Sequence, residues 1–412
     1  MANHNTLRID GGRLWQSLMT MGEIGATDGG GVARIALGEE DRAARDLFVD
    51  WCKAAGLAAR VDRLGNVFGR RQGRDPTCPP VLMGSHLDSQ PKGGRFDGAF
   101  GVLAALEVVR SLNDAGIETE APIEIVNWSD EEGCRFGAGM WASAAFAGLM
   151  TVDDALATAD WQGTTVGGEL ERIGYAGTAP VGGYPIDCFL ECHIEQGPRL
   201  EVAGLKVGIV TGASAQRVYR VTVKGVEGHA GTVPMAERRD ALLGAARMVD
   251  ALHALAVATD DAIVLTIGAF DVLPNGRSTI PSKVVFAVDN RHPGSAVLNE
   301  TAIEIEGICK HIAGDLGLDV EITEQSRRDK ITFDPGLNHI LRNEPEHLGL
   351  GYLELTSGAG HDACKLAHLA PTTMIFVPCR GGASHREDEW AEPEDLEAGA
   401  NLLLRTVLAR AG

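Results

Sequence analysis

The stretch PPVLMGSHLDSQPKGGRFDGAFG, residues 79–101, sets the character of the chain. Residues 79–86 form a short apolar run that predicts a buried strand, and the run ends in polar side chains. A glycine-rich turn follows, and residues 99–114 have the composition of a buried helix that ends near Gly116. Because a strand, a turn and a helix form the repeating unit of α/β proteins, the chain is predicted to contain an α/β sheet.

Two further segments repeat this pattern of an apolar strand that ends in His, Asp or Glu. They are APIEIVNWSDEEG at residues 121–133 and DCFLECHIEQG at residues 187–197. Ligands bind at the carboxyl ends of the strands in such sheets, so the three polar ends are expected to meet at one edge. The alternation of strands and helices predicts a central, mostly parallel sheet flanked by helices.

The pattern changes near residue 213. Residues 217–228 alternate between apolar and polar side chains, as a half-exposed antiparallel strand does. The predicted order is strand, helix, strand, strand, helix and strand, which is that of a ferredoxin-like α+β unit. We therefore expect an α/β domain of residues 1–212 and 328–412, interrupted by an inserted α+β domain of residues 213–327. The later predicted elements of the insertion are helices at about 237–257 and 297–315, and strands near 263–272, 283–291 and 318–324.

Length and composition exclude several classes of protein. A chain of 412 residues exceeds the size of one hydrophobic core, so at least two domains are expected. The net charge of −20 argues against a nucleic-acid or anionic-membrane partner. We find no signal peptide and no uninterrupted apolar run long enough to cross a membrane. The eight cysteines form no CxxC pair, and we interpret them as reduced thiols in a cytoplasmic protein.

The polar strand ends carry the residue types that bind metal ions. His86 and Asp97 lie in the first motif, His193 lies in ECHIEQG, and His385 follows a later apolar strand in GGASHRE. Imidazole and carboxylate suit Zn²⁺, Mn²⁺, Co²⁺ or Ni²⁺. Any one of these residues is more often structural, but their occurrence in order at strand ends of one domain indicates a metal centre.

The adjacent acids of NWSDEEG can divide two tasks, although three consecutive acids are often only a solvated turn. Glu132 can bind a metal ion while Glu131 faces the activated water and removes its proton. A bound metal lowers the pKa of water towards neutrality, so a carboxylate becomes a competent base.

Together these motifs resemble the M20 family of dinuclear metallohydrolases, in particular its amidase, hydantoinase and carbamoylase branch. The matching pieces run in the family's order from about residue 80 to 390. They are GSHLDSQPKGGRFDG, SDEEG, ECHIEQG, GVEGHAGTVPM, LPNGRSTIPS, VDNRHP, TSGAGHDA and GGASHRE.

The resemblance implies two divalent metal ions per subunit, with Asp97 as the bridging ligand. Glu132 with His385 would complete one site, and His86 with His193 would complete the other, although the residues alone leave open how the histidines pair. Asp88 would orient the His86 ring as a carboxylate partner, a common arrangement for a metal-bound imidazole. Glu131 would act as the base and then as the acid that protonates the leaving nitrogen.

The resemblance also implies that the inserted domain is a lid that forms a homodimer contact. His229 would reach the site of the neighbouring subunit, polarise the scissile carbonyl and stabilise the oxyanion. Arg291 would bind the α-carboxylate of the substrate through its planar guanidinium group. The other implied substrate contacts are Gln196, Gln216, Asn275, Gly360 and His361.

The predicted substrate is an N-carbamoyl-L-amino acid, hydrolysed to the amino acid, CO₂ and ammonia. The Gln90–Pro91 pair favours carbamoyl-amino-acid hydrolases and β-ureidopropionases over allantoate amidohydrolases. The alternatives are therefore a β-ureidopropionase, then an allantoate amidohydrolase, and then an M20 peptidase or deacylase. A non-catalytic metal- or amino-acid-binding protein on the same scaffold is the alternative from another class, and Glu131 argues against it.

Overall fold

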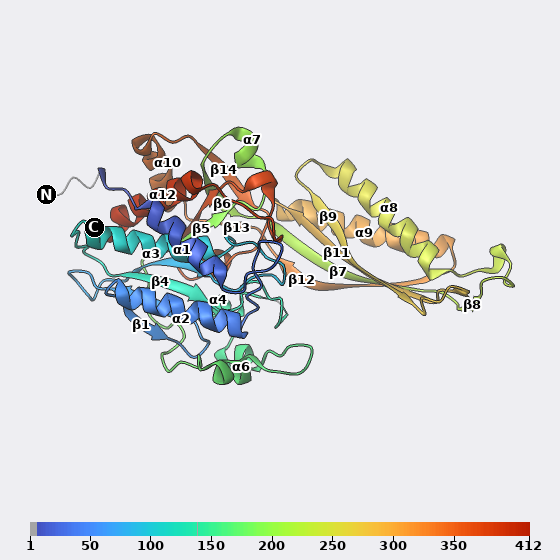
Figure 1. Ribbon diagram of the computed structural model, residues 1–412. Coiled ribbons are helices and arrows are strands. Elements are labelled where there is room, and N and C mark those ends of the chain that lie inside the picture. The colour runs from blue at the N-terminus through green and yellow to red at the C-terminus, as the bar shows by residue number, and fades with distance from the viewer. Residues whose placement is uncertain (1–5, 138) are drawn as a thin grey trace. The chain divides into compact units, whose positions relative to one another are not determined.

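The computed structural model describes residues 6–137 and 139–412 (Figure 1). The chain divides into two compact units, the first of Met1–Gly212 with Thr332–Gly412 and the second of Ala213–Ile331. The second unit starts where the sequence predicts the inserted domain and ends four residues later than the predicted residue 327. The reason is that its last strand continues to Arg328, beyond the predicted end at 324.

The first unit is built on a nine-stranded sheet of order β1-β2-β4-β3-β5-β15-β6-β13, in which β14 also pairs with β6. Its centre consists of β4 (Ile123–Trp128), β3 (Val81–His86), β5 (Cys188–Ile194) and β15 (Thr372–Val377), which run parallel. All residues of these four strands are buried, which explains why they are continuous apolar runs without alternation.

The predicted mostly parallel sheet is thus present, with antiparallel strands at its margins. Strand β2 pairs antiparallel with β4 and with β1, and β6 pairs antiparallel with β15. The bounds of these marginal strands are β1 (Ala58–Val61), β2 (Val67–Arg71), β6 (Val207–Ala213), β13 (Ile331–Thr332) and β14 (Tyr352–Ser357).

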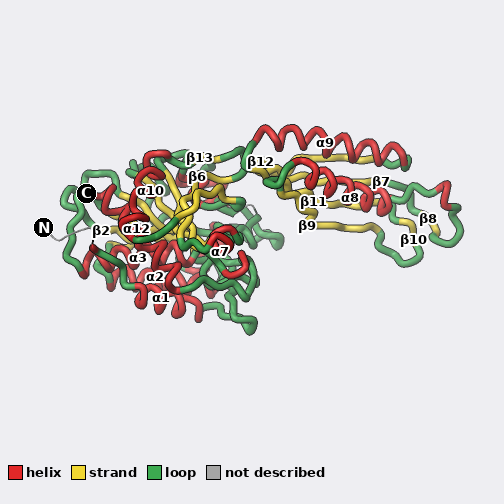
Figure 2. The backbone as a smooth tube through the Cα atoms, turned by 90° about the horizontal axis from the view of Figure 1, so that it is seen from above, coloured by secondary structure: helices red, strands yellow, loops and turns green. Residues whose placement is uncertain are grey.

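Helices cover the sheet of the first unit. Helix α3 (Ala99–Asp114) packs on β3 and β5 (Figure 2). It also contacts α1 (Gly11–Glu23) and α12 (Pro393–Ala411), and these two helices contact each other. The helix is buried along most of its length, as its apolar composition predicts. The other helices are α2 (Glu39–Ala54), α4 (Trp141–Phe146), α5 (Val152–Ala157), α6 (Val166–Ile173), α7 (Arg199–Ala203), α10 (Pro335–Leu348) and α11 (Asp362–Leu366).

The second unit has the predicted ferredoxin-like order. Its antiparallel sheet runs β12-β7-β11-β9, and α8 and α9 supply residues to its apolar core. The predicted first helix began at 237, but α8 begins at Ala241 because the Asp240 side chain accepts hydrogen bonds from the Leu242 and Leu243 amides and caps the helix. The bounds are β7 (Ala215–Lys224), β8 (Gly228–His229), α8 (Ala241–Thr259), β9 (Val264–Leu273), β10 (Thr279–Ile280), β11 (Lys283–His292), α9 (Ser295–Asp315) and β12 (Asp319–Arg328).

Helix α8 is long and apolar enough to cross a membrane, by length and composition alone. Arg247, Asp250 and His253 interrupt its apolar sequence. Its buried residues, among them Met248 and Leu252, pack into the core of the second unit. Several of its other apolar residues, among them Leu242, Leu243 and Val257, are exposed. A single helix of this kind is weak evidence for a membrane span.

Candidate metal centre

The parallel centre of the sheet brings the predicted ligands to one edge of the first unit. His86 is the last residue of β3 and His193 is the penultimate residue of its neighbour β5, so the two imidazole rings lie 6.0 Å apart between centroids. Glu132 lies in the turn after β4, the neighbour on the other side of β3. Adjacent parallel strands end at the same edge, which is why segments far apart in sequence meet here.

Asp97 lies between two sets of ligands. Its Oδ1 is 3.6 Å from His86 Nε2 and 3.1 Å from His193 Nε2, whereas its Oδ2 is 3.5 Å from His385 Nε2. That same nitrogen of His385 lies 3.4 Å from Glu132 Oε2. The two groups of three can each hold a metal ion, and they share Asp97. The structure therefore groups His86 with His193 and Glu132 with His385, as the resemblance implied.

The charge balance of this cluster fits divalent cations. Burial and the neighbouring Asp97 raise the pKa of Glu132 well above its ordinary value. Burial by itself raises the pKa of Asp97, but the attraction of His193 and then His86 outweighs it and holds the pKa well below the usual range. Buried carboxylates that lie close together are stabilised when they bind a proton or a cation. A set of imidazole and carboxylate donors in this state suits Zn²⁺, Mn²⁺, Co²⁺ or Ni²⁺.

The histidine rings are held by main-chain carbonyl groups. Nδ1 of His193 lies 2.9 Å from the Ile194 carbonyl oxygen, and Nδ1 of His86 lies 3.0 Å from the Asp88 carbonyl oxygen. A proton on Nδ1 satisfies each contact and leaves Nε2 with a lone pair for a metal ion. The geometry of both rings is therefore fixed by backbone groups at the strand ends.

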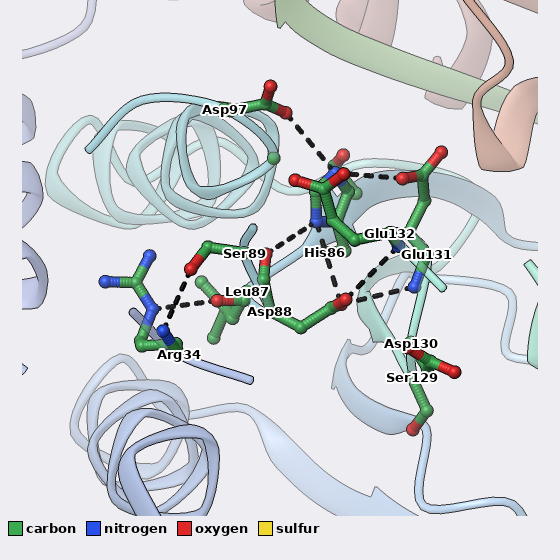
Figure 3. Close-up of polar contacts among 12 residues, drawn as sticks. Arg34, His86, Leu87, Asp88, Ser89, Asp97, Ser129, Asp130, Glu131 and Glu132 are labelled. Atoms are coloured by element: carbon green, nitrogen blue, oxygen red, sulfur yellow. Dashed lines mark hydrogen bonds and ion pairs between the residues drawn. The ribbon is translucent and has the colours of Figure 1, made fainter. Parts of the chain in front are cut away.

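Asp88 lies beside the His86 ring, as predicted, and its backbone makes the closer contact. Its carboxylate Oδ1 lies 3.7 Å from His86 Nδ1, farther than its own carbonyl oxygen. The carboxylate instead accepts hydrogen bonds from the Glu131 and Glu132 amides, both at 3.2 Å (Figure 3). Asp88 therefore ties the end of β3 to the turn that carries Glu131 and Glu132.

Glu131 lies beside the cluster but belongs to neither group of three. Its Oε2 is 3.7 Å from His86 Nε2, and the residue is buried. Burial raises the pKa of Glu131 well above its ordinary value, with Asp362 and Glu132 adding to the effect. A carboxylate of raised basicity beside a metal centre has the chemistry of a general base.

Gln196, a predicted substrate contact, binds Asp97 in the structure. Its Nε2 donates to Asp97 Oδ2 at 2.8 Å and to Ser384 Oγ at 3.1 Å. Its φ of 57° turns the chain sharply after β5 and brings the side chain back over the sheet edge. The residue thus holds the shared ligand of the two groups.

Three further contacts to the cluster were not predicted. Gln90 Nε2 donates to Glu132 Oε2 at 2.7 Å, and Ser384 Oγ donates to Asp97 Oδ2 at 2.8 Å. The carboxyl group of Glu389 accepts a hydrogen bond from the Asp97 amide at 3.0 Å. Gln90 was used only as a marker of the branch, whereas Ser384 and Glu389 flank His385. Ser384 and Glu389 could have been suspected from the sequence because they lie within a few positions of the predicted ligand His385.

His361 lies next to the cluster. Its ring is 4.6 Å from that of His193, and its Nε2 is 3.0 Å from Ser357 Oγ. Gly360 precedes it in the turn before α11. His361 also forms a third possible group with Glu191 and His193, but Glu191 already accepts hydrogen bonds from the Ser85 hydroxyl and the Ala363 amide. The two groups that share Asp97 are therefore the better metal sites.

The predicted residues of the second unit fall into two places. Gln216 and Arg291 lie opposite each other on β7 and β11, and both bind the Asp289 carboxylate, Arg291 at 2.7 Å and Gln216 at 3.0 Å. His229 is exposed and faces Thr279 across the β8–β10 pair, and Asn275 is exposed in the turn that follows β9. The guanidinium group predicted to hold a substrate carboxylate thus already pairs with a carboxylate of the chain.

The sheet, the inserted ferredoxin-like unit and the grouped His, Asp and Glu side chains define a two-domain metal-dependent hydrolase. The chain belongs to Peptidase family M20/M25/M40, whose family model matches residues 82–409. Membership of this family, with these groups of ligands, supports the use of divalent metal.

The proteins that the chain resembles in sequence and structure include amidohydrolases and amidases. The chain is 43% identical to "N-carbamoyl-L-amino-acid amidohydrolase" of Rhizobium meliloti, over 98% of this chain and 97% of that protein. It is 33% identical to "Allantoate amidohydrolase" of Bacillus subtilis, over 93% of each. A solved structure, an amidase of the hydantoinase/carbamoylase family from Burkholderia multivorans, superposes with a TM-score of 0.92 at 50% identity and covers 98% of this chain and 99% of that one.

Gly98 provides a test of the metal centre. Its φ is 65°, and a Cβ at this position would lie 2.3 Å from His86 Cε1. We expect G98A to displace the His86 ring and to lower the metal content of purified protein, measured by inductively coupled plasma mass spectrometry. The matched control is G116A, because Gly116 has a φ of 63° but open space around it. Equal metal content in the two variants would contradict the assigned position of His86.

Proposed function

We propose that the protein hydrolyses the ureido C–N bond of N-carbamoyl-L-amino acids to give the amino acid, CO₂ and ammonia. The observation that carries this proposal is the pair of ligand groups sharing Asp97, with the buried Glu131 beside them. The proposal draws its substrate from the amidohydrolase relatives, which match this chain over nearly its full length.

We propose two metal ions per subunit, held by His86 with His193 and by Glu132 with His385, with Asp97 between them. Divalent ions bound there supply Lewis acidity, which polarises a carbonyl and makes water acidic enough to lose a proton near neutral pH. Glu131 accepts that proton as water attacks the ureido carbon. Its raised pKa then allows it to deliver the proton to the nitrogen of the departing amino acid as the bond between that nitrogen and the ureido carbon breaks. The carbamic acid that remains decomposes to CO₂ and ammonia.

The second unit is proposed to act as a lid and as the contact of a homodimer. Strand β9 is at the edge of the sheet and exposes Val264, Phe270 and Leu273. An exposed apolar edge strand is a surface that pairs readily with another chain. A second copy of this chain is the proposed partner, and His229 of one subunit is proposed to stabilise the oxyanion in the site of the other.

The cytoplasm is the proposed location. None of the eight cysteines, all of which are described, forms a disulfide, and six of them are buried. Disulfides are rare in the reducing cytoplasm, so a chain with eight cysteines and no disulfide fits that compartment.

A substrate panel tests the proposed function. Protein freed of metal by chelation and reloaded with Mn²⁺, Zn²⁺ or Co²⁺ should release ammonia faster from N-carbamoyl-L-methionine than from N-carbamoyl-β-alanine or allantoate. Chelated protein should be inactive, because water then has no activating cation. Faster turnover of N-carbamoyl-β-alanine would instead identify a β-ureidopropionase. Faster turnover of allantoate would favour the activity named for the Bacillus subtilis relative, and full activity after chelation would exclude a metalloenzyme.

Arg291 is proposed to bind the substrate carboxylate. Loss of a charge-assisted contact of this kind costs about 2 kcal/mol or more. Because each 1.4 kcal/mol or so is a factor of ten, R291A should lower kcat/KM for the carbamoyl acid by more than about tenfold. The carbamoyl amide without a carboxylate should be a poor substrate for both proteins. R327A is the control, since Arg327 is exposed on the same sheet and pairs with Glu324. Unchanged kcat/KM in R291A would remove the proposed role.

Subunit complementation tests the role of His229. The H229A variant should retain its metal ions, because the proposed metal ligands all belong to the first unit. It should nevertheless lose most of its turnover, because the oxyanion is no longer stabilised. Mixing H229A with E131A should restore part of the activity in hybrid dimers, where one site receives both intact side chains. Absence of rescue in hybrids verified by mass spectrometry would show that His229 does not act across subunits.

A further inference from the structure

Asp97 is held through its main chain as well as through its side chain. Gln196 and Ser384 bind its carboxylate, whereas Glu389 binds the backbone that carries it. Oε1 of Glu389 accepts hydrogen bonds from the Phe96 amide at 2.9 Å and from the Asp97 amide at 3.0 Å. Glu389 is only 2% exposed. A buried carboxyl group that accepts two successive amides fixes the path of the chain at that point.

We propose that Glu389 is a positioning residue of the metal centre, which sets the Asp97 carboxylate between the two groups of ligands. This inference rests on the metal centre of the proposed function, but not on the identity of the substrate. Asp97 faces His86 and His193 through one oxygen and His385 through the other. A shift of its backbone therefore alters both groups together.

The glycine pair before Asp97 has a requirement that follows from Glu389. A Cβ on Gly94 would lie 1.9 Å from the Glu389 Cδ and 2.0 Å from Oε1. Gly94 does not have the left-handed φ that favours glycine, so its backbone conformation alone does not require the residue. The close approach of the Glu389 carboxyl group does. The turn at Gly94 and the segment that carries Glu389 therefore pack closely because residue 94 has no side chain.

The segment Ser384–Glu389 contacts Asp97 from two sides. Ser384 donates to the Asp97 carboxylate, and His385 lies 3.5 Å from the same oxygen. Glu389 then accepts from the Asp97 amide. Since one short segment supplies a ligand and both kinds of contact, the position of His385 and the position of Asp97 are set together. Such outer contacts orient ligands and tune metal affinity.

The test measures metal binding without substrate. Metal-free wild type, E389A and E389Q would be titrated with Co²⁺ and followed by visible absorption, with bound metal measured after equilibrium dialysis. We expect E389A to weaken Co²⁺ binding by about 10- to 100-fold and to change the absorption bands. E389Q should retain most of the affinity, because its amide oxygen still accepts from the two amides, and its amide nitrogen takes the place of Oε2, an atom without a hydrogen-bond partner among the described residues.

The control is E107A, which removes another fully buried carboxyl group. Glu107 accepts from the Asp10 amide and pairs with Arg13, away from the ligands. It should lower the melting temperature without changing Co²⁺ affinity or spectrum. Wild-type affinity and spectrum in E389A would overturn the proposal, and so would an equal loss of affinity in E107A.

A second variant covers the case in which E389A does not fold. G94A keeps the carboxyl group but displaces it, so it should also weaken Co²⁺ binding and alter the spectrum. Unaltered binding in G94A, with E389Q also unaltered, would overturn the proposal. If E389A weakens Co²⁺ binding while the wild type hydrolyses no carbamoyl acid, the positioning role stands and the proposed substrate fails.

Discussion

The site depends on the contacts that the Asp97 carboxylate makes with two groups of candidate metal ligands. The carboxylate is buried, and its oxygens face His86 and His193 on one side and His385 on the other. A buried carboxylate requires compensating charge and hydrogen bonds, because desolvation of an unpaired charge is costly. The surrounding contacts answer that requirement: Gln196 and Ser384 donate to the carboxylate, and Glu389 holds the backbone that bears it.

Charge is handled differently in the two units. In the first unit, carboxylates of raised pKa crowd around histidines, a state that divalent cations relieve. In the second, Arg291 and Gln216 converge on the single carboxylate of Asp289. If Arg291 binds a substrate carboxylate, that group must share or replace the contact with Asp289. The affinity for an acidic substrate then reflects a competition between two carboxylates, not the strength of one ion pair.

The fold and the grouping of the candidate metal ligands were largely predictable, whereas the contacts around them were not. The parallel strands are continuous apolar runs with polar ends, so the sequence alone predicts that His86 and His193 lie at a sheet edge. The contact of Gln196 with Asp97, and those of the Asp88 carboxylate with the amides of Glu131 and Glu132, were not predicted. Strand periodicity predicts where a strand ends, but the next few residues follow no period, and their backbone turns decide where each side chain points.

The sequence by itself determined which segments are strands, where the inserted domain begins and which residue types could bind a metal ion, because burial and hydrogen bonding impose local patterns. Only the tertiary structure decided how the histidines group around Asp97 and which distant residue holds its backbone. Glu389 contacts Asp97 although it lies 292 positions later in the chain. A contact of that kind depends on how strands order in the sheet and how closely Gly94 lets two segments approach, and neither is encoded in a local pattern.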